Sequence, residues 1–147
     1  MSHRYPVNWQ EFYRNAQALA WRLNAEKTWK GMIAITRGGL VPAAIVAREL
    51  GIRKIDTISI VSYDENDKQI EPSIIKTCEV DNHGKDWLVI DDLVDTGATA
   101  KVVRDMLPKA HIAAIYAKPS GKDLVDTFMT EVSQDTWIVF PWEEEIG

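Results

Sequence analysis

Cysteine is almost absent from this sequence, which has Cys78 as its single thiol among 147 residues. One thiol excludes an internal disulfide, and no cysteine and histidine have the spacing of a zinc site. His3, His83 and His111 lie far apart, and no order of serine, histidine and aspartate indicates a nucleophilic triad. The composition favours a reducing compartment, and we expect a cytoplasmic protein.

Long hydrophobic runs are missing as well. The first residues, Met1 to Pro6, lack the apolar centre of a signal peptide. No stretch approaches the roughly 20 apolar residues that a membrane-spanning helix needs. No basic amphipathic helix or lipidation signal is visible either, so we expect any association with a membrane to be peripheral at most.

Basic residues are in the minority. The 17 Lys and Arg residues are outnumbered by 22 Asp and Glu residues, which gives a formal net charge of −5. Binding to nucleic acid requires a concentrated basic face that neutralises phosphates. The charge therefore argues against a nucleic-acid partner, and it predicts that backbone donors and a metal ion hold any anionic substrate.

The hydrophobic pattern predicts one α/β domain over residues 1–147. Asn8 and Glu11 form a capping box, and apolar residues at helical spacing follow them. Strands that alternate with helices predict a mainly parallel central sheet flanked by helices, with ligands at the carboxyl ends of the strands. The expected strands are 32–35, 55–63, 73–80, 87–90, 111–116, 128–132 and 137–139; the expected helices run from Asn8 to about Asn24, from Pro42 to Gly51, and from the loop 96–99 to about Leu107.

One loop, after the expected strand 87–90, combines acids with a phosphate cradle. Asp91, Asp92 and Asp95 lead into Thr-Gly-Ala-Thr at residues 96–99, where a helix starts. Glycine allows close backbone approach, and the first amides of a helix have no intrahelical acceptor, so this loop suits a monophosphate. The acids suit ribose hydroxyls and Mg²⁺. The loop lacks the lysine of a Walker A motif, and the sequence has no GxGxxG fingerprint.

A second loop, at residues 36–39, has the same placement between a strand and a helix. Gly38 and Gly39 expose backbone amides, and Arg37 adds a fixed positive charge that suits another phosphate group. A monophosphate site, a diol-binding acidic pair, a metal and a second anion site together describe phosphoribosyl pyrophosphate (PRPP).

The segment 89–99, VIDDLVDTGAT, resembles the PRPP-binding motif of the type I phosphoribosyltransferases. The likeness covers nearly the whole chain and points to the bacterial members that act on 6-oxopurines. It includes Trp29–Gly31, Arg37–Pro42, Ala47–Ile52, Ala117–Pro119 and Gln134–Trp137. The resemblance implies Mg²⁺ as cofactor and a small hood region over the base site. It implies purine salvage, in which the 5-phosphoribosyl group passes to guanine or xanthine, and more weakly to hypoxanthine, giving GMP, XMP or IMP and pyrophosphate.

The resemblance also implies roles for individual residues. Asp91 and Asp92 would contact the ribose hydroxyls and the metal, with Asp92 the direct Mg²⁺ ligand, and Asp95 would act as general base or accept a hydrogen bond from the purine. Lys118 would donate to the 6-oxo group, Trp137 would stack on the ring, and carbonyls near Trp137 and Ile138 would read position 2. The resemblance also implies a strained or cis peptide between Thr36 and Arg37. The residues expected to bind PRPP or nucleotide are Arg37, Gly38, Gly39, Lys68, Asp91, Asp92, Leu93, Val94, Asp95, Thr96, Gly97, Ala98 and Thr99.

The sequence departs from the family pattern in the charged stretch 64–69, where relatives carry a mobile loop that closes over PRPP. The arginine expected to reach pyrophosphate has no certain counterpart, and Lys68 is the nearest basic residue.

Two other functions remain open from the sequence. One is a hypoxanthine-guanine phosphoribosyltransferase with little xanthine activity, and the other is a non-catalytic regulator that senses PRPP or nucleotide. The short acidic chain has no evident basic RNA-binding face for such a regulator. The resemblance further implies a homo-oligomer, either dimer or tetramer, and the family includes members peripherally bound to the inner membrane.

Overall fold

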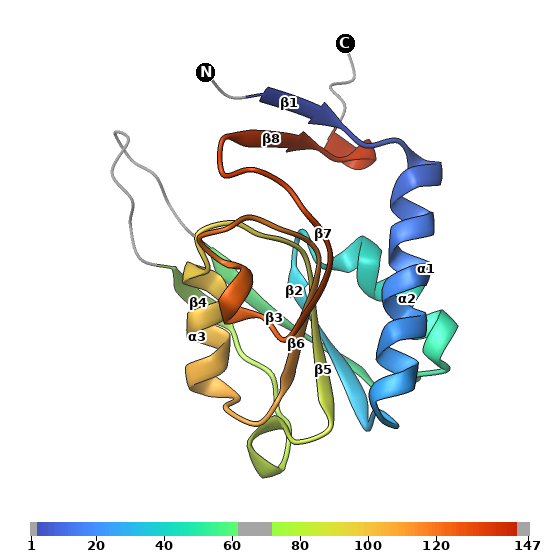
Figure 1. The fold of residues 1–147 in the computed structure, drawn as a ribbon. Coiled ribbons are helices and arrows are strands. Elements are labelled where there is room, and N and C mark those ends of the chain that lie inside the picture. The colour runs from blue at the N-terminus through green and yellow to red at the C-terminus, as the bar shows by residue number, and fades with distance from the viewer. Residues whose placement is uncertain (1–2, 62–71, 144–147) are drawn as a thin grey trace.

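The central element is a sheet of six strands in the order β4-β3-β2-β5-β6-β7, with helices on both faces (Figure 1). The computed structural model describes residues 3–61 and 72–143. Neighbouring strands of this sheet are parallel, except for the antiparallel pair β3 and β4. The predicted α/β architecture is therefore confirmed. The strands are β2 (Gly31–Thr36), β3 (Ile55–Val61), β4 (Ser73–Lys76), β5 (Trp87–Val94), β6 (His111–Ala117) and β7 (Thr127–Glu131).

Three α-helices of the described residues cover the sheet. α1 (Trp9–Glu26) and α2 (Leu40–Leu50) lie on one face, and α3 (Ala98–Met106) lies on the other (Figure 1). The capping box of α1 is confirmed in part, because the Asn8 side chain accepts a hydrogen bond from the Glu11 amide at 2.8 Å. Among the helices of the described residues, none is long and apolar enough to cross a membrane.

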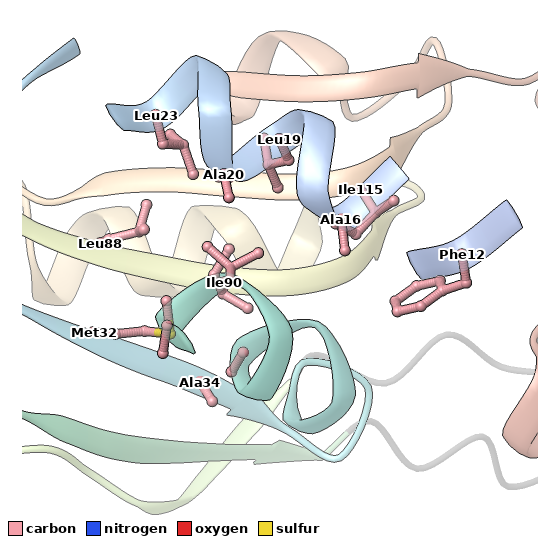
Figure 2. Packing of buried hydrophobic residues seen from close by; sticks show 14 of the residues in the cluster. Phe12, Ala16, Leu19, Ala20, Leu23, Met32, Ala34, Leu88, Ile90 and Ile115 are labelled. Atoms are coloured by element: carbon pink, nitrogen blue, oxygen red, sulfur yellow. The ribbon is translucent and has the colours of Figure 1, made fainter. Parts of the chain in front are cut away.

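Side-chain alternation along β2 divides the core into two layers. Met32 and Ala34 pack with the apolar stripe of α1 and α2, whereas Ile33 and Ile35 pack with the cluster under α3. Figure 2 shows the first layer, in which Leu19 of α1 and Met32 of β2 belong to one cluster of buried residues. Each fully buried side chain of this size contributes about 1.5–3 kcal/mol, so the packing holds the strand ends in fixed positions.

Two element boundaries in this sheet differ from the expected ones. α2 begins at Leu40 and not at Pro42, because the first turn of a helix has unpaired amides and accepts proline at its third position. β5 continues to Val94 and does not end at Ile90, because Val94 still pairs with Ala117 of β6. The sequence did not predict residues 91–94 as part of the strand, because the two adjacent aspartates interrupt the apolar run.

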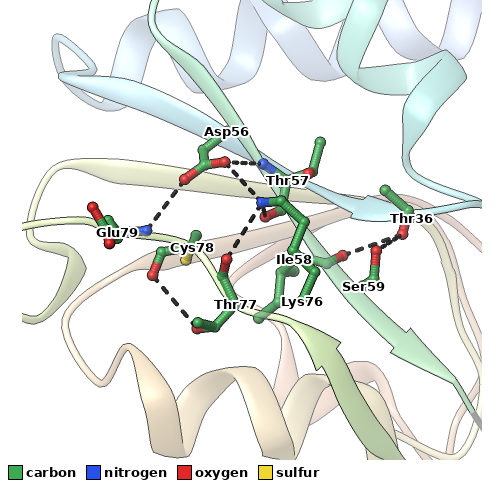
Figure 3. Close-up of polar contacts among 9 residues, drawn as sticks. All are labelled: Thr36, Asp56, Thr57, Ile58, Ser59, Lys76, Thr77, Cys78 and Glu79. Atoms are coloured by element: carbon green, nitrogen blue, oxygen red, sulfur yellow. Dashed lines mark hydrogen bonds and ion pairs between the residues drawn. The ribbon is translucent and has the colours of Figure 1, made fainter.

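The strand expected at residues 73–80 ends at Lys76. Beyond it, side-chain bonds to Asp56 of β3 replace the strand ladder (Figure 3). The Asp56 carboxylate accepts from Lys76 Nζ at 3.1 Å and from the Glu79 amide at 3.2 Å, and the same Nζ donates to the Thr57 carbonyl at 2.8 Å. The charged stretch 64–69, with Lys68, lies outside the described residues.

A second, two-stranded sheet was only half expected. β8 (Thr136–Val139) pairs in parallel with β1 (His3–Pro6), for which no strand was predicted. With the short 3-10 helix Pro141–Glu143, these strands form the hood, residues 3–6 and 136–143. Figure 1 shows the hood beyond the carboxyl ends of the central strands. Aromatic packing ties the hood to α1, because Trp142 meets Phe12 of α1 edge to face, with ring centroids 4.9 Å apart, while it stacks on Phe140 within the hood at 4.8 Å.

Candidate functional site

The two glycine-containing loops meet at the carboxyl ends of adjacent strands. The loop 36–39 follows β2, the segment 91–99 continues from β5, and these strands are neighbours in the sheet. A Cβ atom placed on Gly38 would lie only 2.6 Å from Oδ1 of Asp92. The backbone of one loop therefore lies directly against a carboxylate of the other, which only glycine permits without displacement.

The side chains of Asp91 and Asp92 are partly buried, and their ionisation is unfavourable there. Asp91 accepts a hydrogen bond from the Asp92 amide at 2.9 Å. Burial raises the pKa of Asp91 well above its usual range, and the neighbouring Asp92 raises it further. Burial also raises the pKa of Asp92. A nearby cation would relieve this cost of ionisation.

The donor set fits Mg²⁺ better than a cation that needs a full protein cage. Within residues 3–61 and 72–143, no group of three or more His, Cys, Asp or Glu side chains could hold a metal. Mg²⁺ usually keeps several water ligands and binds through one or two carboxylates together with substrate oxygens. Asp91 and Asp92 supply such carboxylates.

The segment that follows forms a cavity at the start of α3. Asp91 and every residue from Leu93 to Ala100 line it, and its volume is about 220 Å³. Gly97 caps the helix with φ of 91°, a left-handed conformation that glycine adopts without strain. The N-terminus of α3 carries a partial positive charge and amides without intrahelical acceptors, so the cavity suits a phosphate group.

The loop after β2 is tightly built. The peptide between Thr36 and Arg37 is cis, as the resemblance indicated. Gly39 donates its amide to the Ile35 carbonyl at 2.7 Å, and a Cβ atom at Gly39 would collide with the Ile90 carbonyl. The Arg37 side chain is exposed at this edge, where it can reach an anion.

Asp95 lies between two donors from distant parts of the chain. Lys118, at the end of β6, has only 7% of its surface exposed and places Nζ 3.2 Å from Oδ2 of Asp95. Gln134, between β7 and β8, donates to Oδ1 at 2.8 Å. The structure thus brings together two of the residues predicted to contact the base.

The hood carries the other two predicted base contacts. Trp137, on β8, is 61% exposed, whereas tryptophan side chains in folded proteins are on average mostly buried. The side chain of Ile138 is 6% exposed, and its backbone pairs with β1 opposite Tyr5. Lys68, predicted to contact pyrophosphate, lies outside the described residues.

Sequence reasoning missed two residues of this region. Gly121 lies against the loop 95–97, since a Cβ atom there would be 2.7 Å from the Asp95 carbonyl and 3.0 Å from the Gly97 amide. Gln134 was noted only within a segment that resembles the family. Neither position has a local pattern that reveals its contacts, because both act across more than twenty residues of sequence.

The fold and this site define a class of enzyme that binds a phosphorylated sugar at the carboxyl end of a parallel sheet. The family described as "Phosphoribosyl transferase domain" matches residues 7–146, and the chain belongs to that family.

Two relatives share more than half of their aligned residues with this chain. The chain is 61% identical to the xanthine-guanine phosphoribosyltransferase of Desulfotalea psychrophila over 141 residues, which cover 96% of this chain and 87% of that protein. It is 56% identical to the protein of the same name from Nitratidesulfovibrio vulgaris, over 97% of this chain and 86% of the other. Among solved structures, the purine phosphoribosyltransferase of Pyrococcus horikoshii has a TM-score of 0.79 and 29% identity, with 98% and 97% of the two chains covered.

Proposed function

We propose that this chain transfers the 5-phosphoribosyl group of PRPP to guanine or xanthine, and more weakly to hypoxanthine, in purine salvage. The names of the relatives at 61% and 56% identity support the choice of bases. The structural observation that carries the proposal is the contact between Gly38 and Asp92, which joins a candidate pyrophosphate loop to a candidate sugar site.

The two ends of PRPP match the two loops. The amides and hydroxyls of residues 95–99 would hold the 5-phosphate, and Asp91 and Asp92 would accept hydrogen bonds from the ribose hydroxyls. Arg37, Gly38 and Gly39 would bind the pyrophosphate, on which negative charge grows as it leaves. The close approach of Gly38 to Asp92 brings the two loops side by side, as a single molecule bound by both would require.

Asp92, with Asp91 beside it, would hold Mg²⁺. Bound there, Mg²⁺ would supply positive charge against the departing pyrophosphate. Both carboxylates are partly buried, and that of Asp92 is close to Gly38, so they would supply oxygen ligands without closing a cage.

The base would lie between the ion pair and the hood. Lys118 would donate to the 6-oxo group that guanine, xanthine and hypoxanthine share and adenine lacks. Asp95 would accept the proton that leaves the purine as its nitrogen attacks, or hold a hydrogen bond from the ring. Trp137 would stack on the ring, and backbone carbonyls near Ile138 would read the group at position 2. Lys118 and Asp95 form an ion pair in this structure. A base that binds both side chains would therefore replace this ion pair with its own contacts.

A pyrophosphate-release assay tests this function directly. The protein is mixed with PRPP, Mg²⁺ and guanine, xanthine, hypoxanthine or adenine, and the nucleotide formed is identified by chromatography. Release should depend on Mg²⁺ and on a 6-oxopurine, and adenine should give none. Release with guanine and hypoxanthine but not xanthine would favour the hypoxanthine-guanine alternative. No release with any base, or release without a base, would refute the proposal.

We also propose that the chain forms dimers or tetramers, as the resemblance implies. Three large aromatic side chains of α1, Trp9, Tyr13 and Trp21, are 54%, 48% and 66% exposed. Aromatic residues are enriched in the interfaces of protein assemblies. Sedimentation velocity should show a mass at least twice that of one chain, and a monomer at all concentrations would refute this assembly.

A further inference from the structure

Gln134 joins the two sides of the proposed base site. It lies between β7 and β8, three residues before Trp137. Its Nε2 donates to Oδ1 of Asp95 at 2.8 Å, and its Oε1 accepts from the Ser120 amide at 2.9 Å. These contacts define the orientation of the side-chain amide, because only its nitrogen donates and only its oxygen accepts.

Asp95 depends on such contacts for its orientation. Its side chain is 51% exposed, so packing alone does not select one rotamer. Among the described residues, Oδ2 has Lys118 as its donor at 3.2 Å and Oδ1 has Gln134 at 2.8 Å. If Lys118 turns to the 6-oxo group of a base, Gln134 is the described partner that still holds Asp95.

We propose that Gln134 is a positioning residue, which directs the Asp95 carboxylate toward the purine. The proposal rests on the function proposed above. A neutral amide fixes the direction of a carboxylate and leaves its negative charge and its other lone pairs for the substrate. Reacting groups need alignment to within a fraction of an ångström, so a loosely held Asp95 would slow the reaction. The bond to Ser120 anchors the amide itself to the turn after Lys118.

Two variants separate positioning from a structural role. Gln134→Leu removes both hydrogen bonds. Gln134→Glu keeps the shape and the acceptor for the Ser120 amide, but it replaces the donor to Asp95 with a second negative charge. The matched control is Lys30→Met, since Lys30 also donates to an exposed carboxylate, that of Asp81 at 2.7 Å, next to the amino end of β2 and outside the proposed site and interface. Each variant is assayed with guanine, PRPP and Mg²⁺, and its melting temperature is measured.

Both Gln134 variants should lower kcat/KM for guanine by at least about tenfold, the effect of one hydrogen bond to a charged group. Their KM for PRPP should stay within about twofold of the wild-type value, because the phosphate and pyrophosphate loops are untouched. The control should match the wild type, and all melting temperatures should be similar, since Gln134 is exposed.

Three results would overturn the inference. Wild-type kcat/KM in Gln134→Leu would show that Asp95 needs no such support. Activity restored in Gln134→Glu would assign Gln134 to anchoring the Ser120 turn only. In both of these cases the wild type still makes nucleotide, so the proposed function stands. An inactive wild type would refute both proposals.

Discussion

Lys118→Met should weaken recognition of the base without unfolding the protein. Lys118 is almost fully buried, and its one described side-chain partner is Asp95, whose side chain is half exposed. If the ammonium group also donates to the 6-oxo group, the variant loses a hydrogen bond from a charged donor, worth about 1.5–3 kcal/mol. At about 1.4 kcal/mol for each factor of ten, KM for guanine should rise by roughly 10- to 150-fold.

The stability effect of the same change should be small. Methionine fills a similar volume and removes a buried charge, while Asp95 keeps its bond to Gln134 and its access to water. An ion pair with one half-exposed partner contributes little, so the free energy of unfolding should change by no more than about 1 kcal/mol. Steady-state kinetics with guanine, xanthine and hypoxanthine measure the first effect, and thermal melting measures the second.

Lys122→Met provides the matched control. Lys122 pairs with Glu131 at 3.1 Å, close to Lys118 in sequence, but its side chain is 38% exposed and has no proposed contact with the base. Its kinetics should equal those of the wild type. An unchanged KM for all three bases in Lys118→Met would refute the reasoning, and so would an equal rise in KM for guanine in both variants.

Three further substitutions test the acidic loop and its glycine neighbour. Burial raises the folded-state pKa of Asp91, so its ionisation costs stability as the pH rises through that pKa. Asp91→Asn should therefore raise the melting temperature of the metal-free protein, and the increase should be larger at pH 8 than at pH 4. A variant less stable than the wild type at pH 8 would contradict this. Asp95→Asn should lower kcat by about 100-fold or more with folding intact, and wild-type turnover would remove Asp95 from the mechanism. Gly38→Ala should displace the Asp92 carboxylate and raise KM for PRPP roughly tenfold in steady-state assays, whereas an unchanged KM would show that the contact tolerates a methyl group.

Much of the central sheet could be predicted because its signals are local. The apolar run 87–90 and the alternating run from Ile55 predicted strands that the structure contains. Asn8 and Gly51 marked helix ends through capping and a left-handed turn, which depend on a few neighbouring residues. The boundaries that were wrong, at Leu40, Val94 and Lys76, depend on pairing or packing with distant segments.

The sequence alone determined the chemistry of the two loops, because glycines, carboxylates and an arginine at strand ends carry their binding properties wherever the chain places them. Only the tertiary structure decided which of these groups meet. The strand β1 exists through β8, more than 120 residues away, and Asp95 is oriented by Lys118 and Gln134 from two other connections. Such contacts depend on the relative positions of packed elements, and these positions follow from the burial of the whole core rather than from any local pattern.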